Sequence, residues 1–222
     1  MIDLIQFPWS PFCIVQRRIL EFSGKPFKIV NIPSADRSLV WKMTRQRYYL
    51  VPVFRDGKSV VFELGDHSQV LAKYLDAKYQ LELFPPRWEG MQEIVWRHIE
   101  NEIEGPCFKL NDIYYQEFVP PREQLSFLPH KGRKFGHGCI DRWRAGQKEL
   151  QNELTENRGV FEGMLARRSW LLDERPAFID FELFGMLESF LFTGKYKLPR
   201  NRPHVIRWHR NAGLVKAKDF AR

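Results

Sequence analysis

The sequence predicts an α/β layer followed by an all-helical part, and three observations lead to this expectation. Short β-branched and apolar segments alternate with helical patterns over the first eighty residues. A proline-rich connection, "LFPP" at 83–86, fits neither kind of pattern. Beyond it, strand signals fade and amphipathic helical patterns take over. We therefore expect a first domain at 1–80, a linker at 81–87 and a second domain at 88–222.

Seven elements are expected in the first domain. In order, they are a strand at 2–7, a helix at 12–23, a strand at 27–32, a helix at 38–46, strands at 51–54 and 59–63, and a helix at 66–79. Gly24 ends the first helix, and the pair Asp56-Gly57 favours a hairpin turn. Because Pro52 cannot donate a hydrogen bond inside a central strand, we place it at a strand start, after a cis Val51-Pro52 bond. The order β-α-β-α-β-β-α is typical of a thioredoxin-like layer.

The second domain is expected to be built from helices alone. Residues 88–104 predict a long amphipathic helix that stops at Gly105-Pro106. Its expected buried stripe consists of Met91, Ile94, Val95, His98 and Ile99. The segment 179–192 is apolar almost all round, so we expect a helix that is buried on every side.

Composition narrows the class of protein. The net charge of +8 comes from basic residues dispersed along the 222-residue chain, which disfavours nucleic acid as the main partner and equally suits a small anionic substrate. No apolar run approaches the roughly 20 residues that span a bilayer, so no membrane partner is expected. We expect no signal peptide, because no basic stretch precedes an apolar one at the N-terminus. An odd number of distant cysteines (Cys13, Cys107 and Cys139) favours a reducing compartment, hence the cytoplasm.

Four segments together resemble the cytosolic-type glutathione S-transferases, and the resemblance covers essentially the whole chain. They are "SPFC" at 10–13, "VPVF" at 51–54, "HSQVLAKYLDAKY" at 67–79 and "PAFIDFELFGML" at 176–187. The chain departs from the family pattern at His67, where an acidic residue is usual, and at Ala177, where a serine or threonine is usual. The resemblance implies glutathione as co-substrate, a homodimer and a role in detoxification. An apolar contact of that dimer is expected at residues 48–50.

The resemblance also implies a site at the start of the first helix. There the Ser10 hydroxyl and the helix N-terminus would stabilise the thiolate of glutathione. Two alternatives stay open for this segment: Ser10 is an ordinary helix cap, or Cys13 is the nucleophile of a glutathione-dependent thiol/disulfide reductase. A buried, inert Cys13 is also compatible with the pattern. The further glutathione-binding candidates are Trp9, Phe12, Val51, Pro52, Asp66, His67 and Ser68.

A second substrate, electrophilic and hydrophobic or aromatic, is expected between the two domains. The candidate residues for it are Tyr114, Tyr115, Arg133 and His137. A metal is not expected, because His130, His137 and Cys139 lack the spacing of a zinc site. A third function class stays open, namely a non-catalytic interaction module that retains this fold.

Overall fold

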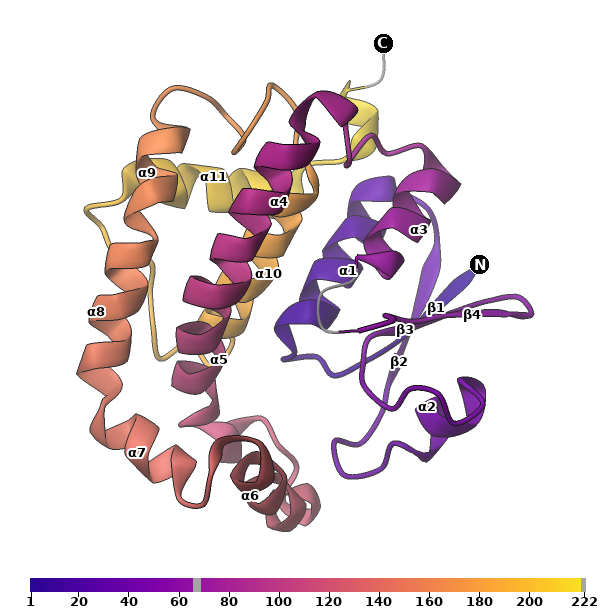
Figure 1. Ribbon diagram of the computed structural model, residues 1–222, viewed down its shortest axis with the longest axis vertical. Coiled ribbons are helices and arrows are strands. Elements are labelled where there is room, and N and C mark those ends of the chain that lie inside the picture. The colour runs from indigo at the N-terminus through magenta and orange to yellow at the C-terminus, as the bar shows by residue number, and fades with distance from the viewer. Residues whose placement is uncertain (66–68, 221–222) are drawn as a thin grey trace.

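The computed structural model describes residues 1–65 and 69–220, and its N-terminal part has the predicted element order (Figure 1). The elements are β1 (Ile2–Gln6), α1 (Pro11–Ser23), β2 (Phe27–Asn31), α2 (Ser38–Met43), β3 (Val53–Asp56), β4 (Ser59–Val61) and α3 (Val70–Tyr79). The strands form one sheet in the order β2-β1-β3-β4. β1 runs parallel to β2 and antiparallel to β3, which confirms the thioredoxin-like arrangement.

Local turn signals explain much of this agreement. Gly24 ends α1 with a φ of +67°, and Gly57 turns the β3–β4 hairpin with a φ of +60°. Both values lie in the left-handed region that glycine adopts without a steric penalty. The Val51-Pro52 peptide bond is cis, as predicted, and Pro52 precedes β3.

The helical remainder follows the proline-rich connection. It comprises α4 (Glu89–His98), a π-helical turn (Ile99–Ile103), α5 (Glu104–Asp112), α6 (Pro121–Phe135), α7 (Cys139–Ala145), α8 (Gln147–Asn157), α9 (Gly159–Leu165), α10 (Phe178–Leu191) and α11 (Pro203–Leu214). Short 3₁₀ turns occur at Pro86–Trp88, Tyr115–Glu117 and Ala217–Phe220. The domain limits at 1–80 and 88–222 stay predictions.

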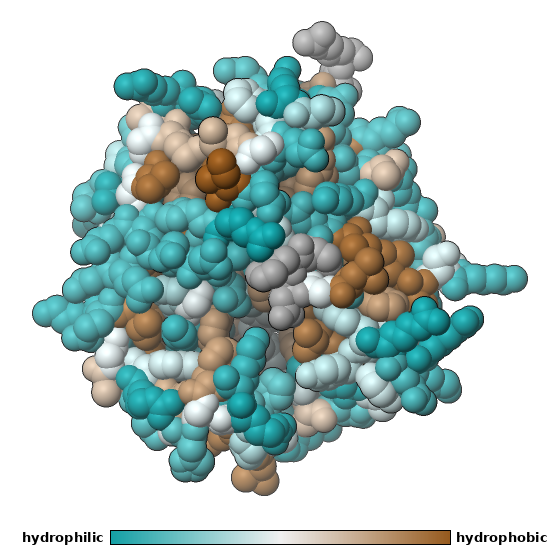
Figure 2. All heavy atoms as spheres, in the orientation of Figure 1, coloured by the Kyte–Doolittle hydropathy of each residue, from teal (hydrophilic) through white to brown (hydrophobic). Residues whose placement is uncertain are grey.

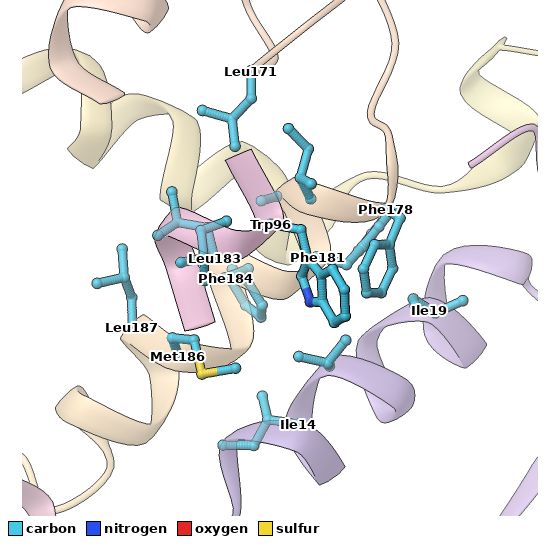
Figure 3. Packing of buried hydrophobic residues seen from close by; sticks show 14 of the residues in the cluster. Ile14, Ile19, Trp96, Leu171, Phe178, Phe181, Leu183, Phe184, Met186 and Leu187 are labelled. Carbon is cyan, nitrogen blue, oxygen red and sulfur yellow. The ribbon is translucent and has the colours of Figure 1, made fainter. Parts of the chain in front are cut away.

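α10 is the central helix of the molecule, as its apolar sequence predicted. It packs against α1 of the sheet layer, and Figure 3 shows its residues Phe178 and Phe181 near Ile19 of α1. Asp180, fully buried at the start of α10, accepts hydrogen bonds from the Ala177 and Leu171 backbone N–H groups at 2.9 and 3.0 Å. This packing joins the helical part to the helix that begins at Ser10.

The predicted stop at Gly105-Pro106 is wrong, because the helix continues through a π-helical turn into α5. A proline removes the N–H that would bond the carbonyl four residues earlier, here that of Glu102. The Asn157 side chain of α8 donates a hydrogen bond to this carbonyl at 3.1 Å. A distant residue therefore satisfies the group that Pro106 leaves without a helical partner.

The predicted buried stripe of this helix is also wrong in part. Met91 is 47% exposed and Ile94 is 65% exposed. Val95 and Ile99 are buried as predicted, and the buried face continues through Trp96. Which side of α4 is buried depends on the elements that pack against it. The helical spacing of apolar residues alone does not show where those elements lie.

Candidate functional site

Ser10 lies in extended backbone at the end of the loop that joins β1 to α1. Its backbone N–H donates to the Phe7 carbonyl at 3.3 Å, and its carbonyl accepts from Ile14 at 2.9 Å. Pro11 then begins α1 with a φ suited to the first helical position. Within the described chain, the Ser10 side chain makes no capping hydrogen bond to α1. Its hydroxyl is therefore not committed to the role of an ordinary helix cap.

Cys13 lies one turn further along α1 and is completely buried. Burial raises the pKa of its thiol to about 11, although hydrogen bonds to the Phe7 backbone and the Ser10 side chain partly offset this effect. At neutral pH the group is therefore a thiol, and the thiolate is the nucleophilic form. Cys107 and Cys139 are also free and buried.

Two cavities meet near the N-terminus of α1. The first, which we call the α6 cavity, has a volume of about 400 Å³ and lies between the β1–α1 loop and helices α5 and α6. The second, the α3 cavity, has a volume of about 710 Å³ and lies beside the cis proline and the segment that leads into α3. Ser10 lines the α6 cavity, and Pro52 lines the α3 cavity. The residues that line both are Phe12, Leu50, Val51, Glu104 and Lys134.

The α6 cavity combines aromatic walls with positive charge. The Arg37 guanidinium lies 4.4 Å from the centre of the Phe7 ring and donates to the Tyr49 carbonyl at 3.0 Å. His130 has a lowered pKa, first because of burial and then because of four cations: Arg37, Lys131, Arg133 and Lys134. Such a cavity suits an aromatic molecule that carries negative charge or gains it during reaction.

The side chain of Glu63 caps the N-terminus of α3. Its two carboxylate oxygens accept hydrogen bonds from the Val70 and Leu71 backbone N–H groups at 2.9 and 3.1 Å. A carboxylate is stabilised there by the free N–H groups and the helix dipole. Asp66, His67 and Ser68, which the sequence assigns to the same end of glutathione, lie outside the described residues.

The other residues that the sequence predicts for the site lie in different parts of the structure. Trp9 and Phe12 line the α6 cavity, as does Arg133. Tyr115 is buried and stacks on Phe127, with ring centres 5.0 Å apart. Tyr114 packs edge-on against Tyr196. His137 lines a separate hollow together with Arg133 and Tyr115.

Several residues of the α6 cavity were not anticipated from the sequence. Arg37 comes from the segment before α2, whereas Glu104 and Phe108 come from α5. Glu104 was assigned to the end of a helix, because Gly105-Pro106 looked like a stop. Only the continued helix brings it to the cavity.

Two classes of feature are absent from the part of the chain that the structure describes. Over residues 1–65 and 69–220, no group of three or more His, Cys, Asp or Glu side chains is arranged to hold a metal ion. In the same ranges, no helix is both long and apolar enough to cross a membrane.

Comparisons with known proteins agree with this architecture. Residues 4–83 match the family model "Glutathione S-transferase, N-terminal domain". Glutathione transferase GSTFuA3 from Phanerochaete chrysosporium has a TM-score of 0.82 at 19% identity, with 100% of this chain and 98% of that chain covered. Two glutathione S-transferases of Ceriporiopsis subvermispora, both crystallised with glutathione, are also similar. CsGST63524 has a TM-score of 0.76 at 16% identity, with 96% of this chain and 98% of that chain covered. CsGST83044 has a TM-score of 0.75 at 18% identity, with 96% and 95% covered.

Likeness at these identities shows the fold, and the sequence match covers the N-terminal part. No curated protein sequence matches the chain. The matched segment contains β1 from Leu4 onward, α1 and the cis proline, which together frame the two cavities. Residues 4–83 therefore match a glutathione S-transferase N-terminal domain in sequence, and the chain as a whole has the fold of the glutathione transferases.

Proposed function

We propose that the protein is a glutathione transferase that activates the thiol of glutathione as a thiolate for attack on an electrophile. The observation that carries this proposal is the Ser10 hydroxyl, which lines the α6 cavity at the N-terminus of α1 without capping that helix. A hydroxyl donor and the positive end of a helix both stabilise an anionic sulfur. The α6 cavity, aromatic and positively charged, would take a hydrophobic or aromatic electrophile.

Glutathione itself would lie along the cis proline. The backbone of Val51 would pair with the cysteinyl unit, with Pro52 fixing the strand and with Trp9 and Phe12 as neighbours. Its γ-glutamyl end would extend into the α3 cavity, toward the helix end that Glu63 now caps, and the sequence assigns Asp66, His67 and Ser68 to that end. The two fungal proteins crystallised with glutathione support this choice of ligand.

Two alternative functions remain to be tested. A thiol/disulfide reductase would use Cys13, whose burial and raised pKa count against it. An interaction module without activity would fail to turn over any electrophile. We also propose that the protein is a cytoplasmic homodimer, as the free cysteines and the family resemblance suggest.

Replacing Ser10 tests the proposal directly. In Ser10→Ala we expect glutathione to bind with similar affinity by calorimetry, while the ultraviolet absorbance of the bound thiolate at neutral pH disappears. The turnover of an electrophile should fall about 100-fold, the usual cost of one lost oxyanion donor. Ser126→Ala, which removes another hydroxyl from the same cavity, is the matched control and should keep the thiolate absorbance.

A second pair of variants separates the alternatives. Cys13→Ala should leave conjugation intact and would abolish activity only if Cys13 were the nucleophile. If Ser10→Ala retains both the thiolate absorbance and turnover, the serine is not the activating group. If the wild-type protein does not bind glutathione at all, the interaction module becomes the better description.

A further inference from the structure

Glu104 occupies a special place between the two cavities. It is one of five residues that line both of them, and with Lys134 it is one of two that are titratable. On the proposed function, the sulfur of glutathione must lie where the cavities meet, because Ser10 borders one and Pro52 the other. Glu104 therefore lies on the helical side of the position where sulfur would meet the electrophile.

A π-helical turn in the backbone places Glu104 at this position. The π-helical turn Ile99–Ile103 ends at Glu104, and α5 begins with this residue. Such turns shift the helical register and often occur at functional sites. Asn157 supports the turn by donating to the Glu102 carbonyl. The position of the Glu104 side chain thus depends on a conformation that a regular helix would not give.

The groups around Glu104 allow its carboxyl group to gain and lose a proton near neutral pH. Burial and the nearby Glu100 raise its pKa to about 7, whereas Lys134, Lys131 and Lys109 act in the opposite direction. Glu182 on α10 is a further buried acid that interacts with Glu104. Groups of this kind are matched to proton transfer at physiological pH.

We propose that Glu104 is the proton donor to the α-carbon when glutathione adds to the carbon–carbon double bond of an α,β-unsaturated carbonyl compound. The proposal deepens the proposed function and rests on it. In this role the Glu104 carboxyl group would donate directly to a reacting atom of the substrate.

The thiolate sulfur forms a bond to the β-carbon, and the π electrons of the double bond move through the α-carbon to give an enolate. The Glu104 carboxyl group gives its proton to the α-carbon and is left as a carboxylate. It is protonated again from solvent, which has received the proton that glutathione lost on forming its thiolate. The net reaction joins glutathione and the acceptor, with no oxidant or reductant.

The experiment compares two electrophiles in the same enzyme. Benzylideneacetone reacts by addition and needs the proton, whereas chlorodinitrobenzene loses chloride with its electron pair and needs none. In Glu104→Gln we expect the ratio of kcat/KM for addition to that for displacement to fall about 100-fold, a typical contribution of a general acid. Glu93→Gln, an equivalent change at an exposed ion pair on α4, should keep the wild-type ratio.

The pH dependence gives an independent readout. In the wild type the ratio should be constant at low pH, where Glu104 is protonated, and should decrease as the pH rises through about 7. In Glu104→Gln the ratio should be low at every pH, because an amide does not titrate. Lys134→Gln removes a positive charge beside Glu104, so the decrease should move to higher pH. This second variant tests the proposal even if Glu104→Gln does not fold.

The outcomes separate the two proposals. A wild-type ratio in Glu104→Gln, or a decrease with pH that persists in that variant, would overturn the role of Glu104 while displacement still supports the transferase. A decrease that Lys134→Gln leaves in place would also overturn it. If the wild-type enzyme catalyses neither reaction, the proposed function fails and the role of Glu104 fails with it.

Discussion

Ser10 and Cys13 lie one helical turn apart, and their surroundings give them opposite chemistry. Ser10 borders a cavity and makes no capping hydrogen bond to α1 within the described chain, whereas Cys13 is completely buried with its pKa raised to about 11. At pH 8 a thiol with that pKa is ionised in roughly one molecule per thousand. The burial and the raised pKa therefore favour Cys13 as a packed apolar side chain over Cys13 as the nucleophile.

This contrast predicts slow cysteine chemistry in the folded protein. Because Cys13, Cys107 and Cys139 are all buried, iodoacetamide at pH 8 should modify none of them rapidly, and all three should react once the chain is unfolded in guanidinium chloride. Intact-mass spectrometry over time measures the number of added groups. Rapid addition of one group at Cys13 in the native state would contradict the burial and would favour the reductase.

The first helix and the central helix approach each other unusually closely at Gly185. A Cβ atom at this position would lie 2.3 Å from the Val15 side chain and 2.9 Å from the Pro11 carbonyl. Neither helix can give way cheaply, because α10 is buried almost all round. The contact therefore fixes the turn of α1 that follows Ser10.

Gly185→Ala should therefore affect both stability and activity. We expect the free energy of unfolding to fall by about 1–3 kcal/mol, as in other overpacked cores, and turnover to fall because the start of α1 moves. Gly163→Ala on α9 is the matched control: its Cβ would meet nothing within 4 Å, so it should be neutral or slightly stabilising. Urea unfolding and steady-state kinetics measure both effects. An equal response of the two variants would show that the close contact is unimportant.

The same elements show what the sequence can predict. Signals that depend only on neighbouring residues predicted the local structure correctly. Gly24 ends a helix, Asp56-Gly57 forms a hairpin turn, and Pro52 follows a cis peptide bond. The stop at Gly105-Pro106 failed, because Asn157 on another helix compensates for the missing N–H. The same difference between local and distant contacts applies to the site. Ser10 could be proposed as a site residue from its own segment, whereas the position of Glu104 at the cavities depends on how distant helices fold together.

At the scale of the whole molecule, hydrophobic side chains remain in contact with solvent. Figure 2 shows a mostly hydrophilic face with separate hydrophobic patches. On α4, Met91 and Ile94 are exposed although they follow the helical apolar pattern, and Tyr49 before β3 is 52% exposed. Tyr48, by contrast, stacks on Phe62 of its own chain, so only part of the expected apolar contact at 48–50 is free for a partner. A second copy of the chain would explain the exposed apolar side chains on α4 and in the segment before β3.

If α4 contributes to a homodimer, a charge at Ile94 should dissociate it. We expect the wild-type protein to sediment as a dimer at micromolar concentration and Ile94→Glu to sediment as a monomer, because burying an unpaired carboxylate at an interface costs several kcal/mol. Val160→Glu on α9 places the same charge on another exposed apolar residue, one that is 56% exposed, and should leave the dimer intact. A monomeric wild-type protein, or dissociation by both variants alike, would rule out α4 as the contact. The thermal midpoint of Ile94→Glu checks that the variant is folded. If it is, the lower mass results from loss of the interface and not from unfolding.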